Sequence, residues 1–196
     1  MTTHRKHSGP RHVLIVIRDG SEDDLDDVVE LWKDLVDHHR EFSDYYTLRR
    51  DGRRNWSKYL REKFSEKSTR LIVAEEDGKL VGFMLCLLDP VKPIFRERTV
   101  GLISDAYVVE HRRRKGIMKE MLAVALRWFR KNKVRAAEIN VSVANREAKE
   151  AWAQLGFKPF AERRRLEFED EKVLALIEGK EREKKKAVRR GKRGRV

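Results

Sequence analysis

One junction in the chain constrains its fold more than any other feature. An apolar run at residues 100–109, rich in β-branched side chains, leads into four consecutive basic residues, a glycine and an amphipathic stretch at residues 116–132. Strands and helices repeat their apolar positions with different periods, so this pattern predicts a strand that turns directly into a helix. The inner stripe of the helix would consist of Ile117, Met121, Leu122, Ala125, Leu126 and Phe129.

The rest of the chain alternates between the same two patterns. Apolar runs predict strands at residues 13–17, 71–74, 80–88 and 136–143, and one bent or two short strands at residues 157–168. Helical spacing predicts helices at residues 21–38, 54–67, 146–155 and 171 to about 190. Asp77-Gly78 is the strongest signal for a hairpin turn. The order βααββ and then βαβαβ predicts an α/β (α+β) fold with a mixed sheet of six or seven strands and about four flanking helices.

Composition excludes several classes of protein. The 196 residues are 40% apolar and 40% charged, and no window approaches the roughly 18 uninterrupted apolar residues of a membrane span. The basic start of the chain lacks the apolar stretch and cleavage site of a secretory signal, so we expect a cytoplasmic protein. Cys86 is the one cysteine, which excludes an internal disulfide and a zinc site built from cysteines.

The formal net charge of +13 is concentrated at the two ends of the chain. Residues 181–196 contain nine Lys or Arg and two Glu, and residues 1–12 contain three Lys or Arg and no acid. The tail could neutralise RNA or DNA phosphates, but a solvated tail fits better because no aromatic side chain interleaves the cations. We predict a flexible basic N-terminus (1–12), a folded domain (13–169) and a terminal helix with a basic tail (170–196).

The strand-to-helix junction also predicts a class of ligand. A helix N-terminus exposes N–H groups without partners and carries a partial positive charge, so a pyrophosphate can bind there. Gly116 permits close approach, and the basic side chains at residues 112–115 add charge. A basic run of this kind is by itself more typical of a solvated turn, and the surrounding sequence decides between the two interpretations.

Two motifs give residues 13–168 a resemblance to the GNAT N-acetyltransferases. Residues 113–117, Arg-Arg-Lys-Gly-Ile, follow a strand ending in Tyr-Val-Val and are similar to the family motif Gln/Arg-x-x-Gly-x-Gly/Ala, with Met118 at the last position. About 30 residues further on, a second signature is matched by Asn145, Ala148, Trp152, Gly156 and Phe157. The resemblance implies a GNAT-like mixed sheet and an acetyltransferase.

The resemblance further implies acetyl-CoA as co-substrate, bound between splayed parallel strands at residues 106–109 and 139–143. The pantetheine would bond to the backbone of residues 106–108 and to the side chain of Asn145, a residue that equally suits a helix N-cap. Backbone N–H groups of residues 114–119 would hold the pyrophosphate. The resemblance assigns cofactor binding to Ala106, Tyr107, Val108, Val109, Arg113, Arg114, Lys115, Gly116, Ile117, Met118, Lys119, Asn145 and Trp152.

The chemistry that the resemblance implies is direct attack by a neutral amine on the thioester carbonyl, in a ternary complex, with a base accepting the proton. Many family members place a tyrosine acid where this chain has Trp152. Indole is not a useful acid, so we expect Trp152 to pack in the core. Either the thiolate leaves unaided, or Tyr107 or another group serves as the acid. No metal is implied.

Asp105 is the first candidate base, because it is the acid within the strand that should flank the thioester. A structural or dimer-contact aspartate is equally consistent, and Glu75 and Glu110 are weaker alternatives at strand ends. Ribosomal-protein alanine acetyltransferases have a Glu where this chain has Asn140, and polyamine acetyltransferases have Glu-Asp where it has Ser104-Asp105. Both differences argue against those substrates.

The acceptor would be a primary amine of a small molecule or a protein. The first two helices and their connection would bind it, with His38, His39, Tyr45 and Tyr46 as the polar or aromatic groups. The histidine pair has no third ligand at helical spacing, so we expect no metal site there. The alternatives are a CoA-binding regulator without turnover and an acetyltransferase whose tail binds nucleic acid. Homodimers are common in the family, and a homodimer is compatible with each of these functions.

Overall fold

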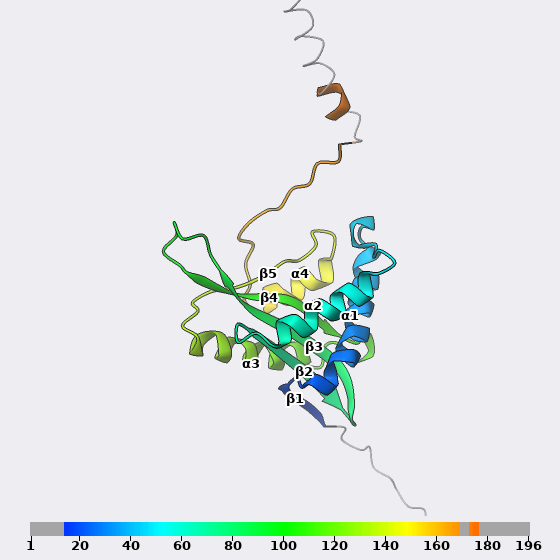
Figure 1. The fold of residues 1–196 in the computed structure, drawn as a ribbon, viewed down its shortest axis with the longest axis vertical. Coiled ribbons are helices and arrows are strands. Elements are labelled where there is room, and N and C mark those ends of the chain that lie inside the picture. Colours follow the sequence, from blue (N-terminus) through cyan, green and yellow to red (C-terminus); the bar gives the residue numbers. More distant parts are fainter. Residues whose placement is uncertain (1–13, 169–172, 177–196) are drawn as a thin grey trace, which may run out of the picture. The chain divides into compact units, whose positions relative to one another are not determined.

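Five strands form one mixed sheet in the order β1-β2-β3-β4-β5 within residues 14–168 and 173–176, which the computed structural model describes (Figure 1). Neighbouring strands from β1 to β4 are antiparallel, and β4 and β5 are parallel. The chain separates into two compact units, residues 1–157 and 158–196. The strands are β1 (Ile15–Asp19), β2 (Thr69–Glu76), β3 (Lys79–Pro90), β4 (Thr99–Val108) and β5 (Ala137–Ile139).

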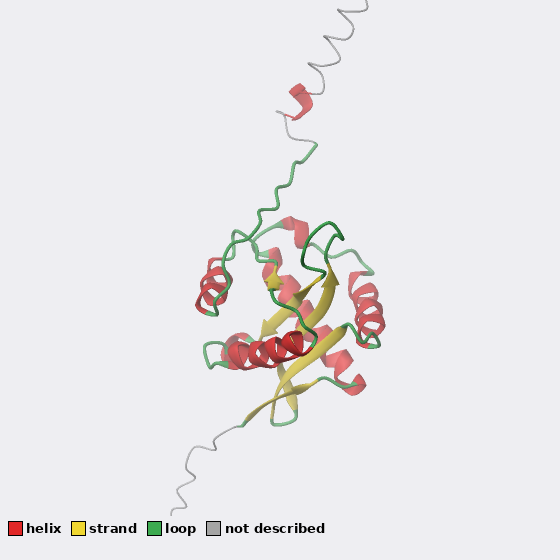
Figure 2. Cartoon of the chain, turned by 90° about the vertical axis from the view of Figure 1, so that its left-hand side faces the viewer, coloured by secondary structure: helices red, strands yellow, loops and turns green. Residues whose placement is uncertain are grey.

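Helices pack on both faces of the sheet (Figure 2). Val73, Phe83 and Leu85 face α1 and α2, whereas Ile72, Met84 and Ile103 face α3 and Trp152 of α4. This alternation is the period-2 pattern of a strand buried on both sides. The α-helices are α1 (Leu25–Arg40), α2 (Gly52–Phe64), α3 (Ile117–Lys131) and α4 (Arg146–Gln154), and the short 3₁₀ turns are η1 (Glu22–Asp24), η2 (Asp44–Tyr46) and η3 (Glu110–Arg112).

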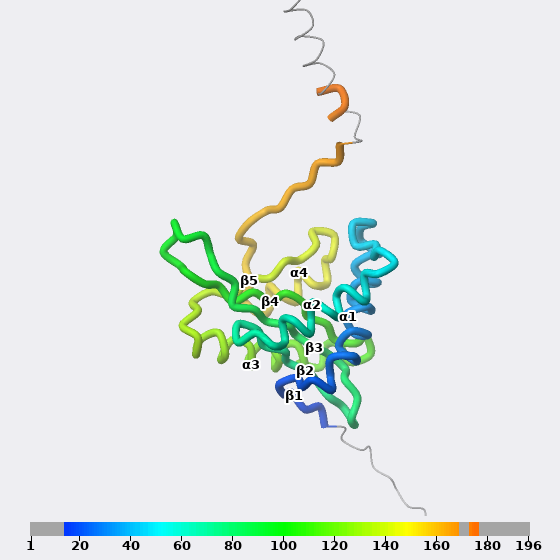
Figure 3. The backbone as a smooth tube through the Cα atoms, in the orientation of Figure 1, coloured from blue at the N-terminus to red at the C-terminus, as the bar shows by residue number. Residues whose placement is uncertain are grey.

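Local sequence signals explain where these elements begin and turn. Asp77 and Gly78 both have left-handed backbone angles, with φ of 50° and 76°, which confirms the predicted hairpin turn between β2 and β3. The backbone N–H and hydroxyl of Ser21 both donate to the Asp24 carboxylate, and this capping box starts the first helical segment. Figure 3 shows that the chain passes from β4 into α3, which lies alongside the sheet. Near the end of α3, the Phe129 ring packs on Gly101 of β4.

A β-bulge changes the direction of the side chains at the end of β4. Leu85 of β3 lies opposite Asp105, but the next residue, Cys86, lies opposite Ile103, so Ser104 is an extra residue in β4. A bulge reverses the alternation of the side chains that follow it. Ile103 therefore faces α3, whereas Tyr107 packs on the side of α1 and α2.

The predicted sheet of six or seven strands was wrong, because the described residues contain five. Residues 158–168 form no strand, and their large apolar side chains Phe160, Leu166 and Phe168 are exposed. Alternation alone does not make a strand, which needs a hydrogen-bonded neighbour, and the ion pairs in this segment are local, as between Glu162 and Arg164. The strand predicted at 136–143 is shorter, since β5 pairs with β4 over three residues.

The C-terminal predictions are only partly covered by the structure. Residues 173–176 are helical, and the remainder of the predicted terminal helix lies outside the described residues, as do the basic segments 1–12 and 181–196. Among the described residues, no helix is both long enough and apolar enough to cross a membrane.

An ion pair joins β1 to the start of the first helix. Asp24 is 8% exposed, and its carboxylate accepts hydrogen bonds from Nη1 and Nη2 of Arg18 at 2.7 and 2.8 Å. The Arg18 guanidinium, with smaller help from Ser21, holds the pKa of Asp24 well below its usual range. The charged carboxylate therefore stabilises the fold.

We expect Asp24→Asn to lower the free energy of unfolding at pH 7 by about 1–3 kcal/mol, the usual cost of disrupting a hydrogen bond to a buried charged group. The pKa of this carboxyl is lower in the folded than in the unfolded state. Its stabilisation is therefore present above the unfolded pKa of about 3.9 and is lost as the pH falls through the folded value.

Denaturant unfolding at pH 7 and at roughly pH 2 measures how much the free energy of unfolding differs between wild type and variant at each pH. Asp27→Asn is the control, because Asp27 is exposed on α1 and forms no ion pair with the described residues. If the free energy of unfolding of the wild type exceeded that of Asp24→Asn by the same amount at both pH values, the result would contradict this role of Asp24.

Candidate active site

The parallel strands β4 and β5 separate after three paired residues. Gly101, Leu102 and Ile103 pair with residues 137–139, and the pairing ends there although β4 continues to Val108. Residues 140–143 leave the sheet. Residues 104–108 therefore have no strand partner on the side of β5, and apart from the Val108 carbonyl, which accepts a hydrogen bond from Arg113, their backbone groups on this side are available to a ligand.

A cleft of about 800 Å³ opens where the two strands separate. It is bounded by the end of β4, the start of α3, α4 and the last turns of α1. Val109 and Lys115 are not among its lining residues. The predicted site residues that line it are Asp105, Ala106, Tyr107, Val108, Arg113, Arg114, Gly116, Ile117, Met118, Lys119, Asn145 and Trp152.

The turn before α3 has the backbone geometry of an anion site. Arg114 and Gly116 are both left-handed, with φ of 60° and 83°, and such alternation makes neighbouring N–H groups converge. The first N–H groups of α3, beginning at Ile117, have no partner within the helix. Arg114 and Lys119 are exposed and form no ion pair within the part of the chain that the structure describes. This end of the cleft can therefore bind phosphate.

Arg112 and Arg113 of the basic run bond to the protein itself. Arg112 donates from Nε to the Glu76 carboxylate at 2.5 Å. Arg113 donates from Nε to the Val108 carbonyl at 3.1 Å, and its Nη1 lies 3.7 Å from Glu147 of α4. Its guanidinium also lies 5.6 Å from the centre of the Tyr107 ring. Arg113 thus connects the two walls of the cleft.

Asn145 and Trp152 form the α4 wall. Asn145 is 4% exposed, and its side-chain oxygen accepts a hydrogen bond from the Ala148 N–H at 2.9 Å. Asn145 is therefore the N-cap of α4, which is one of the two roles that we predicted for it. The Trp152 ring meets the Phe157 ring edge-on, with 5.2 Å between their centres, and belongs to the core beneath α3. This is the packing that we predicted for Trp152.

Asp105 lies on the cleft wall with two hydrogen-bond donors beside its carboxylate. Its Oδ2 accepts the Ser104 hydroxyl at 2.7 Å, and the indole N–H of Trp32 in α1 also lowers the pKa of this carboxyl. Burial raises the pKa of Asp105 by more than these two donors lower it. The carboxylate therefore holds a proton more readily than an ordinary aspartate, as a proton acceptor in catalysis must.

Tyr107 points to the same side of β4. Burial, followed by the nearby Asp34 carboxylate, raises the pKa of its hydroxyl. The phenol therefore keeps its proton at neutral pH and is available as a donor.

The last turns of α1 form the opposite wall through Leu35, His38 and His39. Burial, and then the neighbouring His38, lower the pKa of His39. Tyr46 does not line the cleft but contacts His39, with 5.0 Å between ring centres, and Tyr45 does not line it either.

The two alternative bases lie away from the cleft lining. Glu75 pairs with Arg18 at 2.7 Å, and Glu110 belongs to η3. Sequence reasoning missed Trp32 and Glu147. Trp32 is a buried residue of α1, and no local signal links it to Asp105. Glu147 is the second residue after the Asn145 cap, and this position in the first helical turn was the available signal.

Comparison with known proteins identifies the family of the chain. Residues 29–157 match the Acetyltransferase (GNAT) family. An uncharacterized N-acetyltransferase of Archaeoglobus fulgidus is 33% identical over 138 residues, which are 70% of this chain and 88% of that protein. The chain belongs to the GNAT acetyltransferase family. A second uncharacterized N-acetyltransferase, from Methanocaldococcus jannaschii, is 31% identical over 142 residues, which cover 72% of this chain and 60% of the relative.

Solved structures show the same GNAT fold. The BH1408 protein of Bacillus halodurans, as a tetramutant, superposes with a TM-score of 0.65 at 22% identity, over 78% of this chain and 99% of that one. The aminoglycoside N-acetyltransferase AAC(6')-Iy in complex with CoA gives a TM-score of 0.65 at 18% identity, over 83% and 99%. GNAT membership and the N-acetyltransferase relatives support an acyltransferase.

We expect Trp32→Phe to raise the pKa of Asp105 further, because the variant loses an indole N–H that favours the charged carboxylate. Carboxyl ¹³C NMR during a pH titration of the full chain measures this pKa. Trp56→Phe is the control, since Trp56 stacks on Trp32 with 4.4 Å between ring centres. An Asp105 pKa that is the same in wild type and Trp32→Phe would exclude the proposed hydrogen bond.

Proposed function

We propose that this GNAT protein transfers the acetyl group of acetyl-CoA to a primary amine of a small molecule or a protein, by direct attack in a ternary complex. The observation that carries the proposal is the cleft between the separated ends of β4 and β5, which has Asp105 on one wall and the start of α3 at one end. A structural neighbour of the same fold was solved with CoA.

The residues around the cleft fit acetyl-CoA as co-substrate. The backbone of residues 106–108 has no partner strand on the side of β5, and except for the Val108 carbonyl it suits the amides of the pantetheine arm, while the first N–H groups of α3 suit the pyrophosphate. Met118 replaces the small residue of the family motif, and it packs against the apolar core. Its larger side chain is thus compatible with phosphates on the backbone N–H groups.

Bound acetyl-CoA would supply a thioester carbonyl for the amine to attack and a thiolate that leaves when the carbon–sulfur bond breaks. Asp105 accepts the proton that the amine loses as its nitrogen–carbon bond forms. The Ser104 hydroxyl holds the carboxylate in place through its hydrogen bond, and the Trp32 indole N–H favours the charged form of the carboxylate. Tyr107, protonated at neutral pH, can donate a proton to the departing thiolate.

Gly116→Ala should weaken acetyl-CoA binding about tenfold, equivalent to about 1.4 kcal/mol. The position has φ of 83°, which an alanine adopts only with strain, and a shift of this backbone displaces the N–H groups that would hold the pyrophosphate. Isothermal titration with acetyl-CoA measures the affinity.

Gly78→Ala is a matched control for the glycine variant. Gly78 is also left-handed, with φ of 76°, and at both positions an added Cβ would meet nothing within 4 Å. Both variants should lose similar stability, while Gly78→Ala keeps wild-type affinity. Absence of acetyl-CoA binding by the wild type at millimolar cofactor would overturn the proposed function.

Asp105→Asn should lower kcat/KM by a factor of about 10²–10⁴, the usual contribution of a general base, with unchanged acetyl-CoA affinity. In the wild type, kcat/KM should fall as the pH drops through the raised pKa of Asp105, because the protonated carboxyl cannot accept a proton. Release of free thiol with a panel of primary amines measures the rate.

Asp27→Asn, which removes an exposed carboxylate of α1 that does not line the cleft, is the control for charge and should stay within a few fold of wild type. Wild-type turnover in Asp105→Asn would exclude Asp105 as the base. Acetyl-CoA binding by the wild type without turnover on any amine would instead identify a CoA-binding regulator.

A further inference from the structure

Exposed cations gather at the end of the domain where β4 begins, and we name this surface the basic end. They come from two segments, the β3–β4 connection (91–98) and the last turn of α3 with the loop after it (127–136). The two segments contain one acid, Glu97. The cations of the basic end are Lys92, Arg96, Arg98, Arg127, Arg130, Lys131, Lys133 and Arg135.

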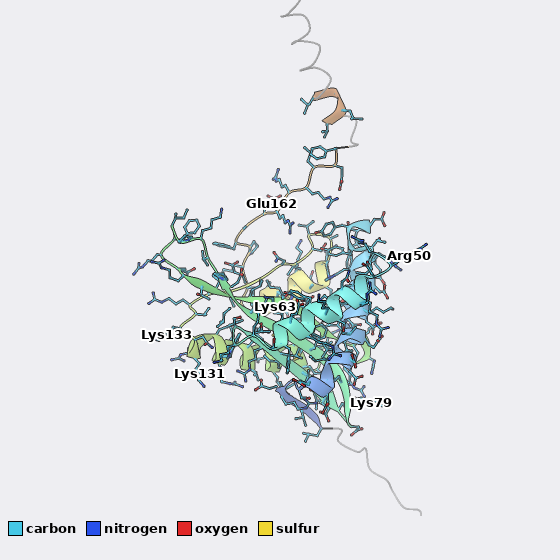
Figure 4. All side chains as sticks on the ribbon, viewed as in Figure 1. Arg50, Lys63, Lys79, Lys131, Lys133 and Glu162 are labelled. Carbon is cyan, nitrogen blue, oxygen red and sulfur yellow. The ribbon has the colours of Figure 1, made fainter. Side chains whose placement is uncertain are left out.

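Backbone pairing brings these two segments together. The Gly101 N–H donates to the Ala136 carbonyl at 2.9 Å, so the chain just after the β3–β4 connection lies beside the chain that enters β5. The Phe129 ring packs so closely on Gly101 that a Cβ there would lie 2.7 Å from it. Figure 4 shows Lys131 and Lys133 on the side from which the β3–β4 connection projects, while Arg50 and Lys79 lie on the other side.

The basic end is separate from the acetyl-CoA cleft. The phosphate-binding turn at residues 113–116 precedes α3, and the basic end lies at the other end of this 15-residue helix, about 22 Å away at 1.5 Å per residue. Its cations are therefore not needed to hold the CoA pyrophosphate.

The charge of the basic end is not neutralised within the described residues. All eight cations are exposed, and none forms an ion pair or a side-chain hydrogen bond there. By contrast, Arg53 and Arg61 of α2 pair with the α1 carboxylates Glu30 and Asp26. Unpaired cations on one surface leave a positive field that attracts a polyanion.

Apolar groups lie among these cations. A hollow of about 240 Å³ has an apolar floor and is flanked by the guanidinium-bearing residues Arg130 and Arg135. At the tip of the connection, Ile94 is 80% and Phe95 is 55% exposed. The floor of the hollow consists of Leu126, Phe129, Val134, Ala136 and Ala137.

We propose that the basic end binds single-stranded nucleic acid, independently of the proposed acetyl transfer. Five of the eight cations are arginines, whose planar fork matches phosphate oxygens. The exposed Phe95 ring offers a surface for base stacking, and the hollow between Arg130 and Arg135 accepts one base beside its phosphate. A lipid surface would favour a broader apolar face than Ile94 and Phe95 provide.

The test uses full-length protein and a fluorescein-labelled single-stranded RNA of mixed sequence, with affinity measured by fluorescence anisotropy over a range of salt concentrations. The variant carries Arg130→Gln, Lys131→Gln and Arg135→Gln. It should bind about tenfold more weakly at moderate salt, and the slope of log K against log salt should fall by about 2, since each lost phosphate contact contributes about 0.7.

A matched control removes the same charge from other exposed positions, through Arg50→Gln, Arg54→Gln and Lys79→Gln. The basic segments 1–12 and 181–196 are present in all three proteins, so a difference between the two variants isolates the basic end. The control should stay within about twofold of wild type, and both variants should melt at the wild-type temperature.

Two further measurements separate the alternatives. Phe95→Ala should weaken RNA binding about tenfold if the ring stacks on a base. The affinity for a DNA strand of the same sequence shows whether binding depends on the ribose 2′-hydroxyl. Binding of either strand supports the proposal. Equal RNA affinity and salt slope in both triple variants would overturn it, as would binding to phosphatidylserine vesicles or an acidic peptide without binding to RNA or DNA.

Discussion

The site depends on the point at which the β4–β5 ladder stops. Hydrogen bonds join the two strands over three residue pairs and end at Ile103 and Ile139, while β4 continues along β3. The bulge at Ser104 lies directly after this point and turns the following side chains toward α1 and α2. One irregularity therefore exposes backbone groups to a ligand and places Asp105 beside Trp32. Arg113 then holds the cleft walls together through Val108 and Glu147.

The charged residues of the domain serve distinct purposes according to their partners. Arg18 and Asp24 stabilise the junction between β1 and the first helix, and Arg112 and Arg113 are bonded to neighbouring groups. Arg114 and Lys119 remain exposed at the start of α3. The eight cations of the basic end form a further group at the other end of that helix. Net charge alone, at +13, does not distinguish these groups, whereas their ion pairs do.

Much of the fold could be predicted because its signals are local. Asp77-Gly78 specified a hairpin, and helical spacing specified the helices that cover the sheet. The absent strand at residues 158–168 shows the limit, since apolar alternation says nothing about whether a hydrogen-bonding neighbour exists. Most of the residues that the GNAT motifs predicted for the site also line the cleft. The Ser104 bulge and the Trp32 contact to Asp105 could not be, because each depends on residues distant in sequence.

The central claim is that acetyl-CoA lies along the separated end of β4 and on the first turn of α3. Hydrogen exchange of the full chain, with and without CoA, tests it most directly. We predict slower exchange of the amides of residues 106–108 and 114–119 when CoA is present, with exchange at residues 91–98 unchanged. Protection that is absent from both of the first two segments while CoA is bound would contradict the account.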